Sequence, residues 1–448
     1  MQSCSGRDAR SKTNPGSQVT FAQSMRRNIA AALPFSNMHS SRVPLSVFTR
    51  RRALQVSAGS LLLAGAKPAT AADPSPMDRG GVRESEVRFP AILKSNEASE
   101  QDVDGPLPDN RRVGFAVVAL GRLSVEQILP AFAHSKKGKL AALVSGSPEK
   151  LEVLGRQYGL EADRLFSYEA YEKLAAIEQV CAVYIVLPNS MHKEFVLRSA
   201  AIGKHVLCEK PMATSSEDAE AMIVACSEKR LKLMIAYRCR YQPHHRELIK
   251  RVQSNQYGSV KLIEAVNAQN QGDPNQWRLR KALSGGGSLP DIGLYCLNAT
   301  RATLGEEPIE IQAQLTSSPN DPRFQEVEES VVWSMRFASG ALAALSTSYG
   351  AHRASRMAVH MDDASLVLDH AFPYTGQRLS LVRAVDGFET EAVIDVPAKD
   401  QFSLEIDHMA ECILNDRSPE TPGEEGLRDM RLMADIYQAA ETGTRLKR

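Results

Sequence analysis

Residues 113–124 read VGFAVVALGRLS, an unbroken apolar run that stops at a glycine. A continuous apolar run is typical of a strand buried on both faces of a parallel sheet. A helical stretch (125–133) and a second apolar run (140–144) follow. The segment therefore predicts a strand–helix–strand unit, the context in which a nucleotide-binding turn is expected.

The turn after the first strand keeps only part of the dinucleotide-binding fingerprint. Residues 119–124 read ALGRLS where the pattern GxGxxG is expected, so only Gly121 of the three glycines is present. Gly121 allows a phosphate to approach the backbone, and the helix that opens at Arg122 offers free N–H groups and the positive end of its dipole. The motif alone fits an α/β domain without a nucleotide equally well.

The end of the second predicted strand indicates which dinucleotide would bind. NAD-specific folds place an Asp or Glu there to bind the ribose 2′-hydroxyl. Here residues 145–150 read SGSPEK, so Ser145 takes the acidic position, with Lys150 and Arg122 nearby. Hydroxyl and ammonium donors suit a 2′-phosphate that an acid would repel. The sequence therefore favours NADP over NAD; the alternative is a solvated loop.

Apolar runs and helical stretches keep alternating up to about residue 236. The runs are 182–186, 205–208 and 232–235, and the helices begin at Met191 and at Ser216, the latter behind a capping box of Thr214 and Glu217. The first run ends in Leu-Pro-Asn and the second in Glu-Lys-Pro. Both are carboxyl ends of predicted parallel strands, where α/β folds bind ligands.

The second half of the chain has a different pattern. Runs with β character follow one another without regular helices between them: 260–268, 309–315, 331–337, 341–349 and 356–362. Two helical stretches, 402–415 and 423–441, close the chain. We expect a dinucleotide-binding domain over 111–236 and a substrate and oligomerisation domain over 237–448.

The N-terminal region is typical of an export signal. The basic run Arg50–Arg52 precedes a modest apolar stretch (53–66) and the small residues Ala69-Thr-Ala71. This predicts a Tat-type signal over 1–72, cleaved near Ala71, and a periplasmic mature protein. Met38 is an alternative start, and a cytoplasmic protein with an accidental basic start is the alternative interpretation. Residues 73–110 are rich in Pro, Ser and charge, and predict an extended arm.

Charge and cysteine usage exclude several classes of function. The first 71 residues hold ten of the 54 Lys and Arg but one of the 53 Asp and Glu, so the remainder has a net charge of −8. That balance argues against nucleic-acid or anionic-membrane binding. The apolar stretch at 53–66 is too short for a membrane span. The seven cysteines and ten histidines show no ligand spacing, so we expect no metal and no disulfide framework.

Five longer motifs follow in order. They are VYIVLPNSMH (183–192), HVLCEKPMAT (205–214), LMIAYRC (233–239), QWRLR (276–280) and GGGSLPDIGLY (285–295). With the turn at 119–124, they resemble the Gfo/Idh/MocA oxidoreductase family, and within it the branch that contains glucose-fructose oxidoreductase. The resemblance covers roughly residues 111–442.

The resemblance implies an α/β fold of two parts. An N-terminal Rossmann dinucleotide-binding domain would precede a C-terminal α/β domain with a large, open, mostly antiparallel sheet. That sheet is the family's usual oligomer interface, so a homo-oligomer, dimer or tetramer, is expected. In that branch an N-terminal arm covers a neighbouring subunit's cofactor, but residues 73–110 match it poorly.

The candidate catalytic residues are Lys210, Asp291 and Tyr295. Asp291 and Tyr295 are four residues apart in a helical stretch, so one face can present both. The unperturbed pKa of tyrosine, about 10, makes it a poor base at neutral pH, and the Lys210 ammonium would lower that pKa. Most family members resemble a D-x-G-x-H pattern; Tyr295 stands at the histidine position, as in the branch named above. The alternatives are a core tyrosine and a surface lysine.

The resemblance also assigns binding residues, position by position. The cofactor contacts that it implies, together with Arg122, are Gly121, Ser145, Lys150, Tyr168, Leu187, Asn189, Glu209, Lys210, Trp277, Arg278 and Tyr349. The substrate-side residues that it implies are Tyr237, Arg238 and Arg301.

Export and the resemblance together predict a two-sugar reaction. The periplasm is not supplied with free NADP, so the enzyme would carry its cofactor out and regenerate it in place. An aldose would be oxidised at C1 to a lactone, and the NADPH formed would reduce the carbonyl of a second sugar. The alternatives are a sugar or polyol dehydrogenase with exchangeable NAD(P), an NAD-dependent glycosidase of the same superfamily, and a non-catalytic binding protein.

Overall fold

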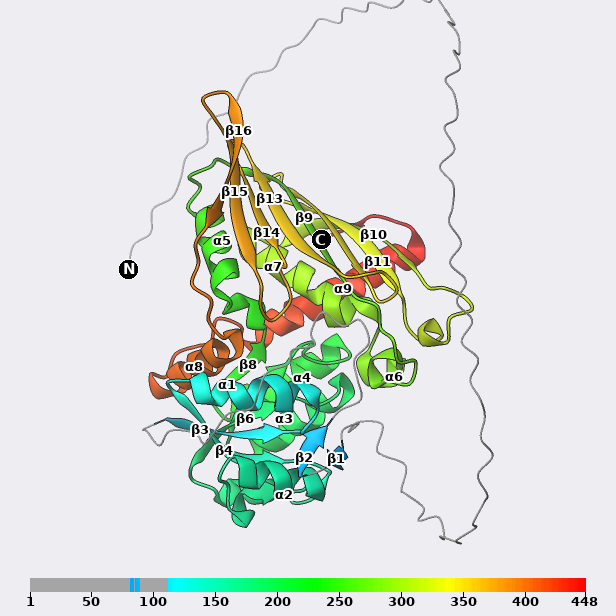
Figure 1. The fold of residues 1–448 in the computed structure, drawn as a ribbon. Coiled ribbons are helices and arrows are strands. Elements are labelled where there is room, and N and C mark those ends of the chain that lie inside the picture. The colour runs from blue at the N-terminus through cyan, green and yellow to red at the C-terminus, as the bar shows by residue number, and fades with distance from the viewer. Residues whose placement is uncertain (1–80, 84, 89–111) are drawn as a thin grey trace, which may run out of the picture. The chain divides into compact units, whose positions relative to one another are not determined.

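The computed structural model describes residues 81–83, 85–88 and 112–448, which all belong to the unit Thr70–Arg448. The predicted export signal (1–72) and most of the predicted arm (73–110) lie outside the described residues. Two sheets with their helices follow each other along the described chain (Figure 1).

The first sheet is parallel and six-stranded, in the order β5-β4-β3-β6-β7-β8. Its strands are β3 (Val113–Val118), β4 (Gly138–Val144), β5 (Leu165–Phe166), β6 (Val180–Ile185), β7 (His205–Glu209) and β8 (Leu233–Ala236). This is the doubly wound order of dinucleotide-binding domains. The order reverses between β3 and β6, so a ligand crevice is expected at the carboxyl ends of these two strands. The predicted Rossmann fold is confirmed.

Helices cover both faces of this sheet. They are α1 (Leu129–His134), α2 (Pro148–Gln157), α3 (His192–Ala201), α4 (Ser216–Glu228) and α8 (Gln401–Leu414). Side chains of α3 and α4 share one core cluster with the sheet. Side chains of α1, α2 and α8 share the other, in which Phe402, Ile406 and Met409 pack with Leu207 and Met234. The late helix α8 therefore belongs structurally to the first sheet, although it is 150 or more residues away in sequence.

The second sheet is nine-stranded, in the order β16-β15-β14-β13-β9-β12-β11-β10-β17. Its strands are β9 (Val260–Ala268), β10 (Pro308–Thr316), β11 (Ser330–Phe337), β12 (Leu342–Ser348), β13 (Ala354–Met361), β14 (Ser365–Asp369), β15 (Arg378–Val385), β16 (Phe388–Ile394) and β17 (Leu446–Lys447). Among the described strands of this sheet, only β9 and β12 pair in parallel. The prediction of a large, open, mostly antiparallel sheet is confirmed.

One face of the second sheet packs on helices and the other is open to solvent. The helices are α5 (Pro243–Gln253), α7 (Leu294–Leu304) and α9 (Gly423–Thr442), with the short α6 (Lys281–Ser284) beyond the edge (Figure 1). Along β11 buried and exposed residues alternate, as the pleat requires. Val332, Leu342 and Val393 are about half exposed or more on their strands. The expected oligomer through this sheet stays a prediction.

The structure differs from the sequence predictions in three places. The helix predicted over 125–133 begins as a π-turn (Ser124–Ile128) before α1. The cap of α4 is Ser215, whose Oγ accepts from Asp218 N at 3.1 Å, so the predicted Thr214–Glu217 capping box is wrong. Within the predicted arm, β1 (Gly81–Arg83) and β2 (Glu86–Arg88) form an antiparallel pair beside α2 (Figure 1).

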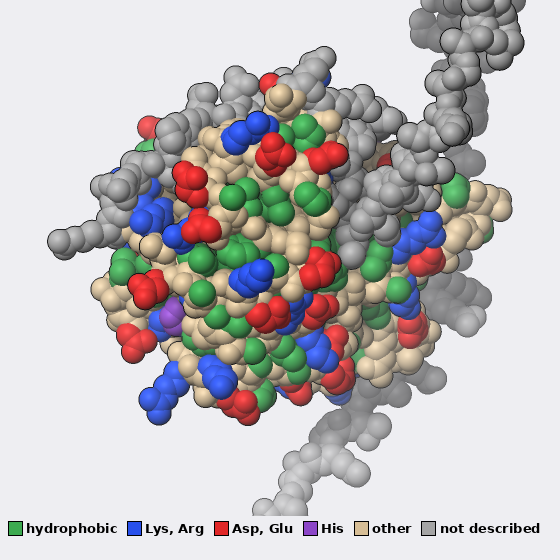
Figure 2. Space-filling model, turned by 90° about the horizontal axis from the view of Figure 1, so that it is seen from below, with side chains coloured by type: hydrophobic (Ala, Val, Ile, Leu, Met, Phe, Trp, Pro, Cys, Tyr) green, Lys and Arg blue, Asp and Glu red, His purple; other side chains and the backbone are tan. Residues whose placement is uncertain are grey.

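Basic and acidic side chains are interspersed on the described surface of the face shown in Figure 2. Within residues 112–448 no helix is long and apolar enough to span a bilayer.

Candidate active site

Lys210 follows β7 directly and links the two sheets. Its Nζ donates to the main-chain oxygen of Asp291 at 2.6 Å and to Asp291 Oδ1 at 3.1 Å. Asp291 lies in a π-helical turn (Leu289–Gly293) that continues into α7. Residues from the carboxyl end of the first sheet and from the second part of the chain thus meet at one ion pair.

The glycine run 285–287 determines where this helix begins. Gly287 N and Leu289 N donate to the buried carboxylate of Glu328 at 2.8 and 2.9 Å. A Cβ at Gly287 would lie 2.1 Å from the main-chain oxygen of Glu328, so no larger residue fits there. Glu328 satisfies N–H groups that a helix start leaves free, and so fixes the position of Asp291.

Asp291 is held by three donors. Besides Lys210, Tyr349 Oη donates to Asp291 Oδ2 at 2.5 Å, and Arg278 Nε lies 3.1 Å from the same oxygen. Burial alone would raise the pKa of the Asp291 carboxyl, but the charges of Lys210 and Arg278 outweigh it and hold the pKa well below its usual range. Asp291 is therefore a carboxylate at neutral pH.

The same contacts involve two residues predicted to bind the cofactor, Tyr349 and Arg278. Tyr349 is fully buried, and its hydroxyl binds Asp291. Arg278 also reaches Asp291, and its guanidinium carbon lies 4.6 Å from the ring centroid of Trp277. Trp277 thus packs beside Arg278, which holds Asp291. The sequence groups both Trp277 and Arg278 with the cofactor contacts.

Tyr295, on the first turn of α7, completes the constellation. Lys210 Nζ lies 4.5 Å from the Tyr295 ring centroid, and so does the guanidinium carbon of Arg238. Arg238 Nε donates to Tyr295 Oη at 3.0 Å. Two cations therefore flank this phenol, and both stabilise its phenolate form. The structure brings together Lys210, Asp291 and Tyr295, as the sequence predicts, and places Arg238, predicted on the substrate side, against the same phenol.

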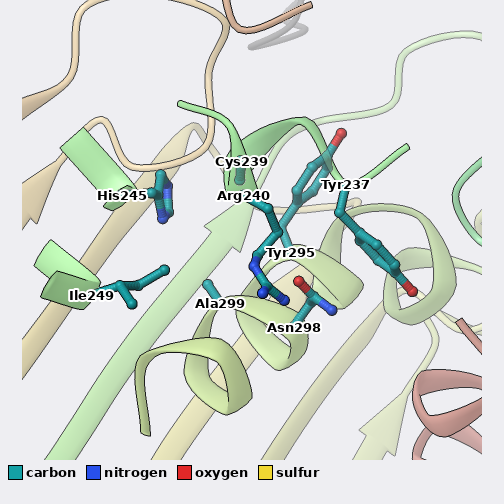
Figure 3. Close-up of a pocket in the computed structure, with 8 residues that line it drawn as sticks. All are labelled: Tyr237, Cys239, Arg240, His245, Ile249, Tyr295, Asn298 and Ala299. Carbon is teal, nitrogen blue, oxygen red and sulfur yellow. The ribbon is translucent and has the colours of Figure 1, made fainter. Parts of the chain in front are cut away.

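A small pocket reaches the Tyr295 ring from the side of α5. Figure 3 shows its lining residues, Tyr237, Cys239, Arg240, His245, Ile249, Tyr295, Asn298 and Ala299. The Tyr237 and Tyr295 hydroxyls point in different directions in this view. Tyr237, predicted on the substrate side, shares this pocket with Tyr295 and is itself buried.

Arg301 does not join the site. Its guanidinium lies 2.5 Å from Asp429, 3.1 Å from Glu425 and 2.5 Å from Glu307, and the side chain is buried. These carboxylates bind it into a network between α7 and α9. Three acids thus occupy the guanidinium of Arg301 in this structure, and its substrate role stays a prediction.

The turn after β3 leaves open space beside Gly121. Ala119 stands where the fingerprint has its first glycine, and it adopts φ +77°, the left-handed region that favours glycine. A Cβ at Gly121 would meet no atom of the described residues within 4 Å. Packing of this part of the chain therefore does not require glycine at 121, whereas close approach of a phosphate does.

The end of β4 offers the donors predicted for a 2′-phosphate. Ser145 is buried, and its Oγ accepts from Ser147 N at 3.1 Å. Lys150 Nζ donates to Leu120 O, next to the Gly121 turn, at 3.3 Å. Burial lowers the pKa of the Lys150 ammonium to about 8. A phosphate beside this amine would restore its usual pKa, so the site fits the extra phosphate of NADP.

The other predicted cofactor residues divide into two groups. Arg122 forms an ion pair with Glu126 at 2.8 Å, and the ring of Tyr168 packs on Gly146 beside Ser145, so these contacts lie just beyond the carboxyl ends of β3 and β4. The second group makes contacts within the protein. Leu187 O accepts from His192, Asn189 Nδ2 donates to Ser284 O at 2.8 Å, and the Glu209 carboxylate accepts from Tyr184.

Sequence reasoning missed Tyr184 and Glu405, which bind each other beside Glu209. No local signal identifies them, because Glu405 is 196 residues beyond Glu209 and looks like any helical glutamate. In the described part of the chain no three His, Cys, Asp or Glu residues could hold a metal together.

A doubly wound sheet with an open phosphate turn, and a Lys–Asp–Tyr set at its carboxyl edge, define a nicotinamide-dependent oxidoreductase. Two family descriptions match the chain: "Oxidoreductase family, NAD-binding Rossmann fold" over residues 113–237 and "GFO/IDH/MocA C-terminal domain" over 245–367. The chain belongs to the Gfo/Idh/MocA oxidoreductase family, as its motifs predict.

Several relatives are similar over most of the chain. D-xylose 1-dehydrogenase [NADP(+)] of Haloarcula marismortui is 31% identical over 341 residues, which are 74% of this chain and 91% of that protein. The structure of aldose-aldose oxidoreductase from Caulobacter crescentus complexed with glycerol is 41% identical, with a TM-score of 0.73, and covers 75% of this chain and 100% of its own. Levoglucosan dehydrogenase, at 19% identity and a TM-score of 0.67, shares the fold.

Proposed function

We propose that the protein is an exported, NADP-dependent sugar oxidoreductase that oxidises an aldose at C1 to a lactone. It then returns the hydride to the carbonyl of a second sugar without releasing its cofactor. The observation that carries this proposal is the joint approach of Lys210 and Arg238 to the Tyr295 phenol. The 41% identity to a structure named aldose-aldose oxidoreductase favours a second aldose as the acceptor.

NADP is the proposed cofactor. Ser145 and Lys150 replace the acid that would bind a free ribose 2′-hydroxyl, and two similar proteins are named as NADP-dependent D-xylose 1-dehydrogenases. Gly121 and the helix start beyond it would hold the pyrophosphate. When bound, the nicotinamide supplies the hydride acceptor and donor.

The side chains of this protein manage the proton. In the oxidative half, Tyr295 takes the proton of the sugar C1 hydroxyl, while Lys210 orients that hydroxyl. Asp291 fixes Lys210 and remains ionised. In the reductive half, Tyr295 returns the proton to the oxygen of the second sugar's carbonyl. One phenol thus serves both directions.

The proposed location is the periplasm. It rests on the basic run, apolar stretch and Ala-Thr-Ala site of residues 50–71, which lie outside the described residues. Because Tat export carries folded proteins, the cofactor would cross already bound.

The test is native mass spectrometry of the purified protein, followed by sugar additions without added cofactor. We expect one NADP(H) per chain to survive dialysis. A first aldose should raise the reduced-nicotinamide absorbance once, and a second sugar should return it to its starting value. Turnover that requires added NADP would reject cofactor retention.

That outcome would favour a conventional sugar dehydrogenase with exchangeable cofactor. The observation in its favour is the 31% identity over 91% of D-xylose 1-dehydrogenase. In that case each turnover would consume one added NADP, and lactone would form without a second sugar.

Lys150 provides a prediction on pH. Because the pKa of its ammonium is about 8, we expect the dissociation constant of NADP to rise by up to tenfold per pH unit above pH 8, as the amine loses its proton. NAD lacks the 2′-phosphate, so its affinity should not follow this trend. Lys150→Met should weaken NADP binding at pH 7 and abolish the trend. Exposed Lys136→Met is the control, and binding titrations of the apo-protein measure both.

A further inference from the structure

Two buried carboxyl groups share one phenol behind Lys210. The Oη atom of Tyr184, on β6, lies 2.9 Å from Oε1 of Glu209, at the end of β7. The same oxygen lies 3.2 Å from Oε2 of Glu405 on α8. Tyr184 and Glu405 are fully buried, and Glu209 is 7% exposed.

The two hydrogen bonds among Tyr184, Glu209 and Glu405 require one proton more than the phenol supplies. A phenol has one proton to donate, so Tyr184 can satisfy only one carboxylate at a time. The second carboxyl can bind the phenol oxygen only by donating a proton of its own. If both glutamates were ionised, the second carboxylate would face a lone pair of the phenol oxygen and be repelled by it. The two carboxylates would also repel each other, because little water is present to screen them. One of the two glutamates is therefore an un-ionised acid.

The surroundings identify Glu405 as the acid that holds the proton. Glu405 Oε1 is buried and has no hydrogen-bond partner among the described residues, which costs much less for a neutral acid than for a carboxylate. Glu209, by contrast, also accepts from Lys210 N at 3.3 Å. Burial, and then the Glu209 charge, raise the pKa of Glu405 well above its usual range. Burial raises the pKa of Glu209 to about 7, against the charge of Lys210.

Helix α8 connects this pair to the catalytic phenol through Arg238. Gln401, one turn before Glu405, accepts from Arg238 Nη1 at 2.9 Å, and Arg238 Nε donates to Tyr295 Oη. The charge of Arg238 acts on both glutamates. The titratable and charged groups that act on Glu405 from its own helix start and from the neighbouring elements are Asp400, Tyr184, Glu209, Arg238 and Tyr241.

We infer that Glu405 is a positioning residue for the acid–base step, holding a proton that Tyr184 links to Glu209. With Glu405 neutral, the three cations Lys210, Arg238 and Arg278 outnumber the two carboxylates that contact or adjoin Lys210, Glu209 and Asp291. The net positive field favours the Tyr295 phenolate. When Glu405 ionises at alkaline pH, the added negative charge makes Tyr295 keep its proton. This inference rests on the proposed function for its catalytic half only.

The location of the proton is tested without activity. In the infrared spectrum of the purified holoenzyme at pH 7, we expect a carbonyl band of an un-ionised carboxylic acid. Glu405→Gln should remove the Glu405 component of this band, since glutamine has the shape of the neutral acid. Glu411→Gln, a partly exposed glutamate on the same helix, should leave it. A band of unchanged intensity in Glu405→Gln, or the absence of any such band from the parent protein, rejects the assignment.

The catalytic role is tested on the pH profile of single-turnover reduction of the second sugar, which needs protonated Tyr295. The parent enzyme gains a negative charge as Glu405 ionises, and Glu405→Gln cannot. We therefore expect the rate of Glu405→Gln to fall at a pH about one unit lower than that of the parent enzyme. The rate of Glu411→Gln should fall at the same pH as that of the parent. Superimposed pH profiles for Glu405→Gln and the parent would overturn the role. If no sugar reacts at all, the proposed function fails, while the infrared band still decides where the proton is.

Discussion

Replacing Lys210 with methionine is expected to lower kcat for sugar oxidation by about a thousandfold, because general acid–base assistance is worth about 10²- to 10⁴-fold. Lys210 Nζ is the group that meets both Asp291 and the Tyr295 ring. Methionine keeps an unbranched side chain that is one atom shorter, and it removes the charge. The change is measured as the rate of nicotinamide reduction in a single turnover at saturating sugar.

Loss of stability must be separated from loss of catalysis. Removing one partner of a buried ion pair costs about 3–5 kcal/mol, because the other charge is left without compensation. Arg278 and Tyr349 still hold Asp291, so we expect the lower end of that range. In the double variant Lys210→Met/Asp291→Asn, the free energy of unfolding should recover while kcat stays low. If kcat recovers with stability, Lys210 acts only on the fold.

The same pair sets the acid side of the stability curve. The folded pKa of Asp291 is below its unfolded value of about 4, so this residue contributes stability above pH 4 and loses it as the pH falls through the folded pKa. Lys210→Met weakens that depression of the pKa. Its acid unfolding should therefore begin at a higher pH than that of the parent, as followed by circular dichroism.

The fold was predictable where burial leaves a pattern. Residues 113–118 are buried on both faces and read as an apolar run, and β11 alternates because one face is covered. Strand β16 was missed because nearly all its side chains are exposed, so no alternation marks it. Strand β14 is only five residues long, and short apolar runs are ambiguous.

The site was predictable where one residue type carries the chemistry. Lys210, Asp291 and Tyr295 stand in motifs, and each has a reactive group that the reaction needs. Arg238 and Tyr349 were predicted as binding residues, but the acid or phenol that each contacts was not predictable, because the partners come from distant positions. Tyr349 is 58 residues from Asp291, and Arg238 is 57 from Tyr295. Arginine and tyrosine are common in both binding sites and cores, so their types do not reveal which acid or phenol they contact.

Replacing Tyr295 with phenylalanine is expected to lower kcat by a factor of about 10² to 10⁴, with little change in KM. The ring would still pack between Lys210 and Arg238, but no group would remain to take the C1 hydroxyl proton. Arg238 Nε would lose one acceptor while Gln401 and Phe372 O still bind its other nitrogens. We therefore expect a destabilisation of about 1–3 kcal/mol, measured by denaturant unfolding.

Two matched variants make this test specific. Tyr295→His supplies an imidazole, the acid–base group of the family pattern, and should recover part of the rate with its pH optimum moved toward the pKa of histidine. Tyr374→Phe alters the other aromatic ring against Arg238 (4.6 Å) and should leave kcat within about threefold. If Tyr295→Phe keeps a tenth of the activity or more, the proton leaves by another group. Lys210 Nζ also lies against that ring, so Lys210 would then be the group to test for the acid–base step. The pH profile of Tyr295→Phe would have to follow the titration of that amine.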